Sequence, residues 1–205
     1  AKNIGLYSIA GIMFWLCGYN VAYGISEGGF IGTFSPWADG TDFKKDSYAA
    51  GSDWYFQMVF AATTASIVSG TLAERIKIWP FFLFVAILTG VLYPIEMGWQ
   101  WGGGWLAAKG FSDFAGSTLV HAAGGAAALA GAIILGPRVG RFTNGKNLLP
   151  FAASSIPLAT LGTFVLWFGW FGFNGGSQLA LGTFADASAI CLLYTSPSPR
   201  DVEES

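Results

Sequence analysis

Apolar residues gather in long runs that contain no charged side chain, and short polar stretches separate these runs. The uncharged runs cover residues 3–26, 54–73, 78–95, 114–137 and 147–185. A helix needs about 17–25 residues to cross the hydrocarbon core of a bilayer. The first four runs therefore each fit one membrane helix, and the fifth fits one helix followed by a polar connector rich in glycine.

This pattern predicts an all-α fold, a polytopic transmembrane helical bundle with five spans and the start of a sixth. Hydrophobic residues make up 53% of the chain and charged residues 11%, which is typical of a membrane protein. No strongly basic region occurs, so we expect no binding to nucleic acid. We place the five spans at about residues 4–24, 54–73, 78–96, 114–136 and 149–173.

Lysine and arginine differ in number between alternate loops. One set of loops holds Lys2, Arg75, Lys77, Arg138, Arg141 and Lys146, and the other holds Lys44, Lys45 and Lys109. Cytoplasmic loops of membrane proteins carry the excess of positive charge. We therefore expect the N-terminus, the 74–77 turn and the 138–147 loop to be cytoplasmic.

Small residues in the fourth span indicate where helices pack closely. Ala123, Ala127 and Gly131 follow one another at four-residue spacing. Helices in lipid associate where small side chains let their backbones approach. We expect these residues to form a packing stripe.

Several candidate functional residues fall at the outer end of this arrangement. Phe56 and Phe60 lie one helical turn apart near the end of the second span, and Trp101 follows the third span. Asp113 precedes the fourth span. Phe173 and Ser177 end the fifth span at the same side, so we expect all six side chains to converge there.

His121 is the only histidine of the chain and lies within an apolar span. A continuous helix from Asp113 would place it roughly 12 Å deeper than the outer rim, at 1.5 Å per residue. An ionisable side chain within a membrane span is a functional candidate. Its unperturbed pKa is near 6.5, so in an apolar site the neutral imidazole predominates at neutral pH and can accept or donate a hydrogen bond.

Together these features suit a path for ammonium. Aromatic faces attract a cation by about 0.5–2 kcal/mol. Carrying a bare cation through the bilayer centre costs several kcal/mol. Ammonium can release a proton and cross as neutral ammonia, whereas potassium cannot.

Each candidate also has a structural interpretation. Asp113 is a good N-cap for the helix that follows, as well as a possible ligand. Phe56 and Phe60 fit ordinary packing, and Trp101 fits an interfacial belt of aromatic residues. Cys17 and Cys191 have no metal-ligand spacing, so we expect neither a metal nor a cofactor.

Four sequence blocks resemble the ammonium transporter (Amt/Rh) family, in order and with matching intervals. They read FQMVFAATTASIVSGTLAERIK, WGGGWLAAKGFSDFAGSTLVHAAGG, GPRVGRF and WFGFNGGS. The resemblance extends from residue 1 to about residue 190. It implies that the chain holds the family's second to sixth membrane helices and the start of the seventh.

The resemblance also implies roles for individual residues. Phe60, Trp101 and Ser177 match the family's outer ammonium-recruitment site, and Asp113 matches the carboxylate that supports it. Phe56 and Phe173 match the two stacked rings that gate the pore. His121 matches the first of two pore-lining histidines. The family further implies ammonium and ammonia as substrate, a homotrimer in the lipid bilayer of the plasma membrane, and a cytoplasmic regulatory protein as a possible partner.

Two parts of the family pattern have no match in this chain. The first family helix and the second half, which holds the partner histidine, are missing, so we do not expect these 205 residues to conduct alone. Residues 191–205 depart from the family into Pro, Ser and charge and resemble translated adapter sequence. We therefore assign residues 1–190 to a partial transporter membrane domain and 191–205 to a tail of artefactual origin.

Other functions fit part of the pattern. An ammonium sensor of the same fold would bind at the outer rim and signal to a cytoplasmic partner. An intramembrane enzyme would use His121 as a general base and Ser117, four residues earlier, as nucleophile. A purely structural membrane subunit would leave the aromatic cluster and the imidazole unexplained.

Overall fold

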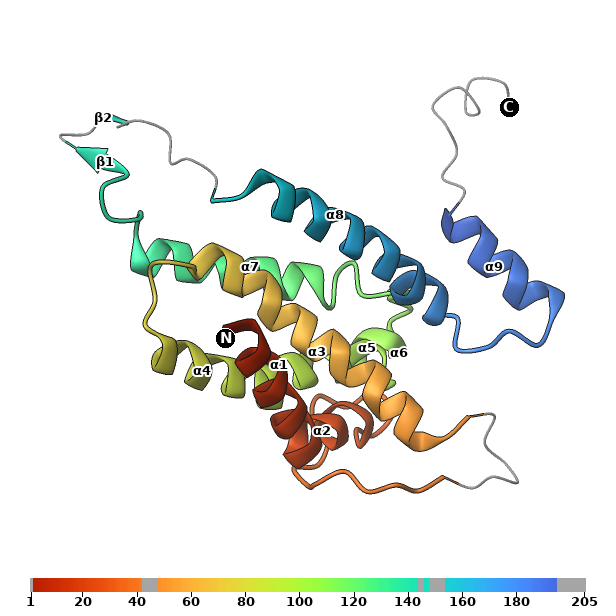
Figure 1. The fold of residues 1–205 in the computed structure, drawn as a ribbon. Helices are drawn as coiled ribbons and strands as arrows, with labels where there is room; N and C mark the ends of the chain where they lie inside the picture. The colour runs from red at the N-terminus through yellow and green to blue at the C-terminus, as the bar shows by residue number, and fades with distance from the viewer. Residues whose placement is uncertain (1, 42–47, 144–145, 148–153, 195–205) are drawn as a thin grey trace. The chain divides into compact units, whose positions relative to one another are not determined.

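A computed structural model describes residues 2–41, 48–143, 146–147 and 154–194. The chain divides into two compact units, Ala1–Leu149 and Pro150–Ser205. The described residues are helical apart from loops and one small hairpin, in which the strands β1 (Phe142–Thr143) and β2 (Lys146–Asn147) pair antiparallel. The predicted helical fold is confirmed (Figure 1).

The first unit contains most of the helices. They are α1 (Lys2–Met13), η1 (Phe14–Gly18), α2 (Tyr19–Tyr23), α3 (Ala50–Leu72), α4 (Ile78–Ile87), η2 (Leu88–Leu92), α5 (Tyr93–Gln100), α6 (Trp105–Ala108) and α7 (His121–Leu135). The elements named η are single π-helical turns inside longer helices. Such turns are rare and often occur near functional sites.

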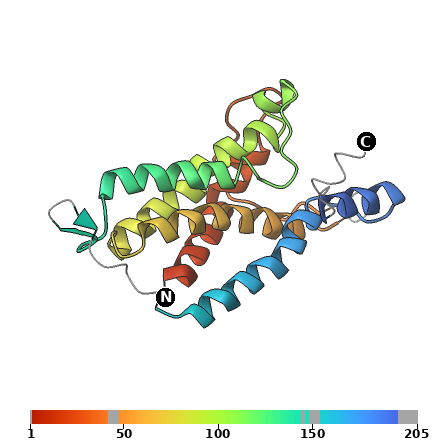
Figure 2. The ribbon, with the colours of Figure 1, turned by 90° about the horizontal axis from the view of Figure 1, so that it is seen from above.

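Helix α3 is the centre of packing in this unit. It lies against α1 on one side and α7 on another, and α1 also packs on α4 (Figures 1 and 2). Its buried residues include Phe60, Ala61, Thr64, Ala65 and Val68, each at most 1% exposed. This packing places the start of α3 beside the loop that follows α5.

Glycine sets the distance between α7 and α3. A Cβ atom on Gly124 would lie 3.0 Å from Ile67 and from the carbonyl oxygen of Thr64, and one on Gly131 would lie 2.5 Å from Leu72. Gly124 and Ala128 are buried. The contact face therefore includes Gly131 of the predicted stripe, but Gly124 and Ala128 take the places expected for Ala123 and Ala127.

The second unit contains α8 (Ile156–Trp170), η3 (Phe171–Gly175) and α9 (Phe184–Tyr194). The Ser155 hydroxyl caps α8 by accepting a hydrogen bond from the Leu158 N–H at 3.3 Å. Before α9, the Asp186 N–H donates to the Thr183 hydroxyl while the Thr183 N–H donates to the Asp186 carboxylate. These reciprocal bonds are a capping box.

Three helical stretches of the described residues are long and apolar enough to cross a membrane: Lys2–Tyr23, Ile78–Ala108 and Ile156–Gly176. They correspond to the predicted first, third and fifth spans. Helix α7 is apolar but has 15 residues. Helix α3 has 23 residues, and its Gln, Thr and Ser side chains lower its hydropathy.

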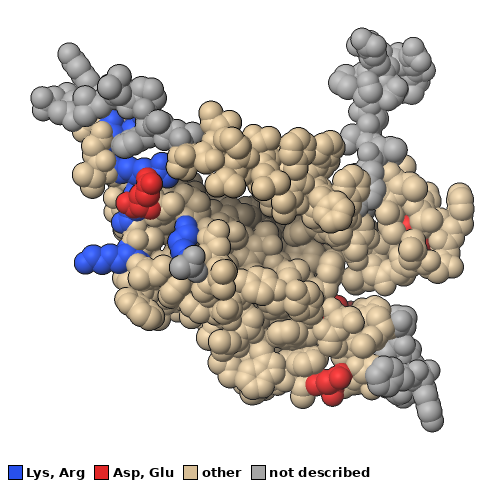
Figure 3. Space-filling model, viewed as in Figure 1, with Lys and Arg blue, Asp and Glu red and all other residues tan. Residues whose placement is uncertain are grey.

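The three basic segments of the first unit meet at one end. The Lys2 ammonium group donates to the Ser69 carbonyl at 2.9 Å, Arg75 donates to the Gly136 carbonyl at 2.7 Å, and Arg138 pairs with Glu74 at 3.1 Å. Figure 3 shows Lys and Arg side chains gathered there. The N-terminus, the α3–α4 turn and the loop after α7 therefore share one side of this unit.

Candidate functional site

Three aromatic rings form a contiguous cluster at the opposite end of the first unit. The Phe56 and Phe60 ring centroids lie 4.9 Å apart at 77°, and those of Phe60 and Trp101 lie 5.3 Å apart, also at 77°. Both contacts are edge-to-face, the geometry that aromatic quadrupoles favour. Phe60 is 1% exposed and packs in the core, whereas Phe56 and Trp101 are half-buried. We call Phe56, Phe60 and Trp101 the aromatic mouth.

Trp101 is held in place by the loop that precedes α7. Its indole Nε1–H donates to the main-chain oxygen of Asp113 at 2.7 Å. Its own N–H donates to the Met97 carbonyl at 2.9 Å and so ends α5. Both the ring and its backbone are thereby fixed beside Phe60.

The Asp113 carboxylate organises the loop around it. Oδ1 accepts hydrogen bonds from the N–H groups of Gly116 (2.8 Å) and Ser117 (3.1 Å). Oδ2 accepts from those of Thr118 (2.8 Å) and Leu119 (2.8 Å). Successive N–H groups that converge in this way form an anion nest. Asp113 is 8% exposed, and these four donors to its carboxylate are all backbone N–H groups.

Asp113 does not cap the helix predicted to begin at residue 114. Residues 114–120 form turns, and α7 begins only at His121. Gly116 adopts a φ of +91°, a conformation that interrupts a helix and favours glycine. The expected depth of about 12 Å for His121 assumed helical rise from Asp113, and residues 114–120 do not form that helix. The proposed helical pairing of Ser117 with His121 is wrong for the same reason.

Sequence reasoning missed Gly116. A Cβ atom there would lie 2.5 Å from Val120 and 3.3 Å from the Trp101 ring. The Gly116 carbonyl also accepts hydrogen bonds from the N–H groups of Val120 and His121. Gly116 thus links Asp113, Trp101 and His121. The segment DFAGSTLVH contains this glycine, but a lone glycine gives no signal of its φ.

His121 is the first residue of α7. Its Nδ1 lies 3.1 Å from the Gly116 carbonyl oxygen. A carbonyl oxygen only accepts, so a hydrogen bond at this contact requires the proton on Nδ1, and in that tautomer of the neutral imidazole Nε2 is an acceptor. The side chain is exposed in this structure. The loop thus presents the imidazole with a defined orientation.

Phe173 and Ser177 lie in the second unit. Phe173 is part of the π-helical turn η3, and the Ser177 hydroxyl donates to the Phe173 carbonyl at 2.8 Å. The two residues are therefore fixed relative to each other. Their convergence with the aromatic mouth stays a prediction.

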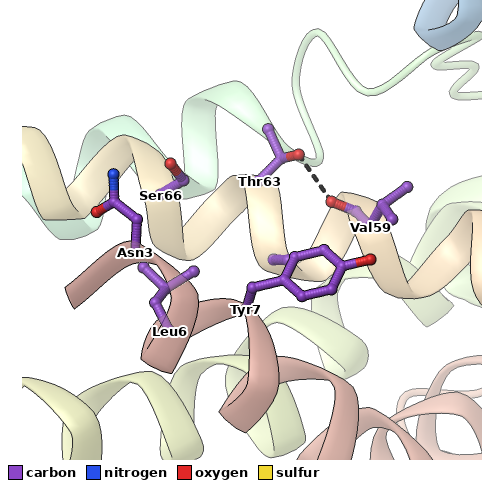
Figure 4. Close-up of a pocket in the computed structure, with 7 residues that line it drawn as sticks. Asn3, Leu6, Tyr7, Val59, Thr63 and Ser66 are labelled. Carbon is purple, nitrogen blue, oxygen red and sulfur yellow. Dashed lines mark hydrogen bonds between the residues drawn. The ribbon is translucent and has the colours of Figure 1, made fainter. Parts of the chain in front are cut away.

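A groove of about 210 Å³ lies elsewhere in the first unit, between α1 and α3. Asn3, Leu6 and Tyr7 line it from α1, and Val59, Thr63 and Ser66 line it from α3 (Figure 4). It includes none of the predicted site residues. Within the described residues, no group of three or more His, Cys, Asp or Glu side chains could hold a metal ion.

Comparison with known proteins identifies the family. The sequence model of the Ammonium Transporter Family matches residues 2–196. A putative ammonium transporter of Synechocystis sp. is 44% identical over 87% of this chain and 41% of its own length. Ammonium transporter Amt2 of Archaeoglobus fulgidus is 39% identical over 87% of this chain and 40% of its own length.

Solved structures agree with this result. A structure described as a sensor Amt protein has a TM-score of 0.77 and 37% identity, covering 91% of this chain and 47% of that one. Mep2 of Saccharomyces cerevisiae has a TM-score of 0.73 and 30% identity, covering 85% of this chain and 40% of that one. The chain spans less than half the length of these relatives. It belongs to the ammonium transporter family and is an integral membrane protein.

Proposed function

We propose that this chain forms part of a protein that moves ammonium nitrogen across a membrane. The observation that carries the proposal is the continuous set of contacts from the aromatic mouth through Asp113 and Gly116 to His121. It joins a cation-attracting surface to an imidazole ring that can form hydrogen bonds. Family membership supports the same substrate.

Ammonium would first collect at the aromatic mouth. Trp101 and Phe56 are both half-buried, so part of each ring is open to a ligand. Cation–π attraction contributes about 0.5–2 kcal/mol, depending on how far the cation is desolvated. We assign Phe60, Trp101 and Ser177 to recruitment, with Asp113 holding Trp101 in position.

The proton would leave before the molecule passes the gate. We assign the gate to Phe56 and Phe173, whose rings exclude a hydrated cation from the apolar span. Ammonia that passes it can exchange a hydrogen bond with the imidazole of His121, which the Gly116 contact orients. Removing the charge avoids most of the cost of placing an ion in the bilayer.

The larger assembly is also a proposal. We place the full-length protein in the plasma membrane as a homotrimer, with the basic end of the first unit in the cytoplasm. Nine Lys and Arg residues lie between residues 2 and 146, and the excess belongs to that end, as the positive-inside rule requires. A cytoplasmic regulatory protein would contact the same side.

A sensor function is the second candidate. The 37% identical structure is described as a sensor Amt protein. Such a protein would bind ammonium at the aromatic mouth and transmit the signal without net flux. The enzyme alternative is not supported, because the family is one of transporters and Ser117 shares no helix face with His121.

Uptake of labelled methylammonium tests the proposal. The assay uses proteoliposomes that hold a protein of full family length containing this chain, here called the full-length transporter. Trp101→Ala should raise the half-saturating concentration between about twofold and thirtyfold, the equivalent of the lost cation–π attraction. His121→Ala should lower the maximal rate. Trp79→Ala removes a 77% exposed ring from the opposite end and should change neither value.

Three results would decide between the candidates. Uptake by wild type that both site variants impair supports a transporter. Ammonium binding without uptake by wild type supports a sensor. Full uptake, with unchanged discrimination against potassium in both site variants, would show that the site assignment is wrong.

A further inference from the structure

A second group of polar atoms lies on α5, the helix that ends directly before Trp101. Tyr93, Glu96 and Gln100 follow at spacings of three and four, so they share one helix face. Glu96 is five residues from Trp101, about 7.5 Å along a helix axis. The sequence analysis assigned no role to any of the three.

Each of these side chains has a buried oxygen without a hydrogen-bond partner among the described residues. These oxygens are the Tyr93 hydroxyl, Glu96 Oε2 and Gln100 Oε1. Tyr93 is 1% exposed, and its hydroxyl lies within electrostatic range of the Glu96 and Asp113 carboxylates. The Thr64 side chain interacts with the Tyr93 hydroxyl, but the Thr64 proton is donated to the Phe60 carbonyl at 3.1 Å, so Thr64 does not donate to the Tyr93 oxygen. Buried polar atoms without partners are rare and call for an explanation, such as a bound ion, ligand or water.

Among the described residues, neighbouring groups supply these oxygens with neither a hydrogen-bond donor nor a positive charge. Two of the three are acceptors only, and the third can also accept. Asp113 adds negative charge near Glu96, and its oxygens are engaged by the backbone. Among the described residues, Glu96 forms no ion pair with a Lys, Arg or His, whereas Glu74 pairs with Arg138. A buried carboxylate without a counter-charge is costly.

A small cation with several N–H donors meets both needs. Ammonium carries one positive charge and four donors, so it can neutralise Glu96 and satisfy several oxygens at once. Potassium supplies charge without donors, and water supplies donors without charge. Ammonium and methylammonium supply both the charge and the N–H donors, so they fit this cluster.

We propose that Tyr93, Glu96 and Gln100 form a subsite that binds the ammonium cation next to the aromatic mouth, before its proton is released. Glu96 supplies the charge, and the Gln100 and Tyr93 oxygens accept N–H groups. This inference rests on the proposed function, since it extends the same route. It adds a binding position that is distinct from the rings and from His121.

Ammonium binding and uptake by the full-length transporter test the subsite. Glu96→Gln keeps the shape of the side chain and removes its charge. It should raise the half-saturating ammonium concentration about tenfold or more, since a hydrogen bond to a charged group is lost. Ammonium chloride should raise the melting temperature of the wild type more than tetramethylammonium chloride does, because the tetramethylammonium cation has no N–H donor. Glu96→Gln should remove most of this difference.

Glu27→Gln is the matched control. Glu27 is exposed in the loop after α2, and the substitution makes the same change in charge. It should leave both readouts at wild-type values. Gln100→Leu, which keeps the charge of Glu96, should raise the half-saturating concentration severalfold and carries the test if Glu96→Gln does not fold.

The result that would refute the subsite differs from the result that would refute transport. If Glu96→Gln, or Gln100→Leu in its place, leaves the half-saturating concentration and the ammonium-specific stabilisation at wild-type values, the subsite is refuted and the oxygens bind water. A wild-type protein that binds ammonium with Glu96-dependent stabilisation but shows no uptake would refute transport and leave the subsite standing.

Discussion

Asp113→Asn tests whether the anion nest supports the mouth. Asparagine keeps one acceptor oxygen and replaces the other with an NH2 donor. In either orientation of the amide, two of the four N–H groups between Gly116 and Leu119 face a donor instead of an oxygen. A buried donor left without an acceptor costs about 1–3 kcal/mol, so the loss is about 2–6 kcal/mol.

The free energy of unfolding of the full-length transporter in mixed micelles, titrated with sodium dodecyl sulfate, measures this loss. Asp39→Asn provides the control, because Asp39 is exposed and, among the described residues, accepts hydrogen bonds from Thr41 nearby. It should behave as wild type. The loop that Asp113 organises also holds the Trp101 indole, so Asp113→Asn should raise the half-saturating ammonium concentration as well. Wild-type stability and uptake in Asp113→Asn would refute the role assigned to this carboxylate.

Two further predictions concern the backbone and the basic end. Gly116→Ala should destabilise the protein by about 1–3 kcal/mol, because it combines a φ of +91° with contacts to Val120 and Trp101. Gly103 also has a positive φ, but a Cβ atom there would meet no other atom within 4 Å. Equal effects of Gly103→Ala and Gly116→Ala on stability and uptake would therefore exclude a role for the contacts to Val120 and Trp101. Glu74→Gln should cost less than about 1 kcal/mol, because the Arg138 pair is exposed. A larger loss in the same titration would show that the pair is part of the structural core.

The long apolar helices over Lys2–Tyr23, Ile78–Ala108 and Ile156–Gly176 could be predicted from the sequence because membrane helices follow from hydropathy and length. Phe56 and Phe60 were predicted as a one-turn pair, and their rings are in contact at 4.9 Å. The basic segments were predicted on one side, and contacts made by Lys2, Arg75 and Arg138 join them. Each of these results depends on helical periodicity or on charge, which are properties of local sequence.

The loop before α7 could not be predicted in this way. An apolar run without charge reads as helix from residue 114, yet seven residues form turns before His121. The cause is the Asp113 carboxylate, which draws four N–H groups out of the helical pattern, together with the φ of Gly116. A hydropathy pattern cannot show that a side chain competes with the helix for backbone donors. The oxygens on α5 that have no hydrogen-bond partner among the described residues could not be predicted either, because burial of Tyr93 and Glu96 depends on tertiary packing.

Cysteine cross-linking in the full-length transporter tests most directly whether both units contribute to one ammonium path. The background carries Cys17→Ser and Cys191→Ser, which remove the cysteines of this chain. Phe56→Cys is paired with Phe173→Cys for the test and with Phe164→Cys, at a 58% exposed position of α8, for the control. The proposed gate predicts efficient cross-linking of positions 56 and 173 by a short bifunctional reagent, with protection by ammonium, and none between 56 and 164. Absence of the 56–173 product, or equal yields for both pairs, would contradict a gate built from the two units.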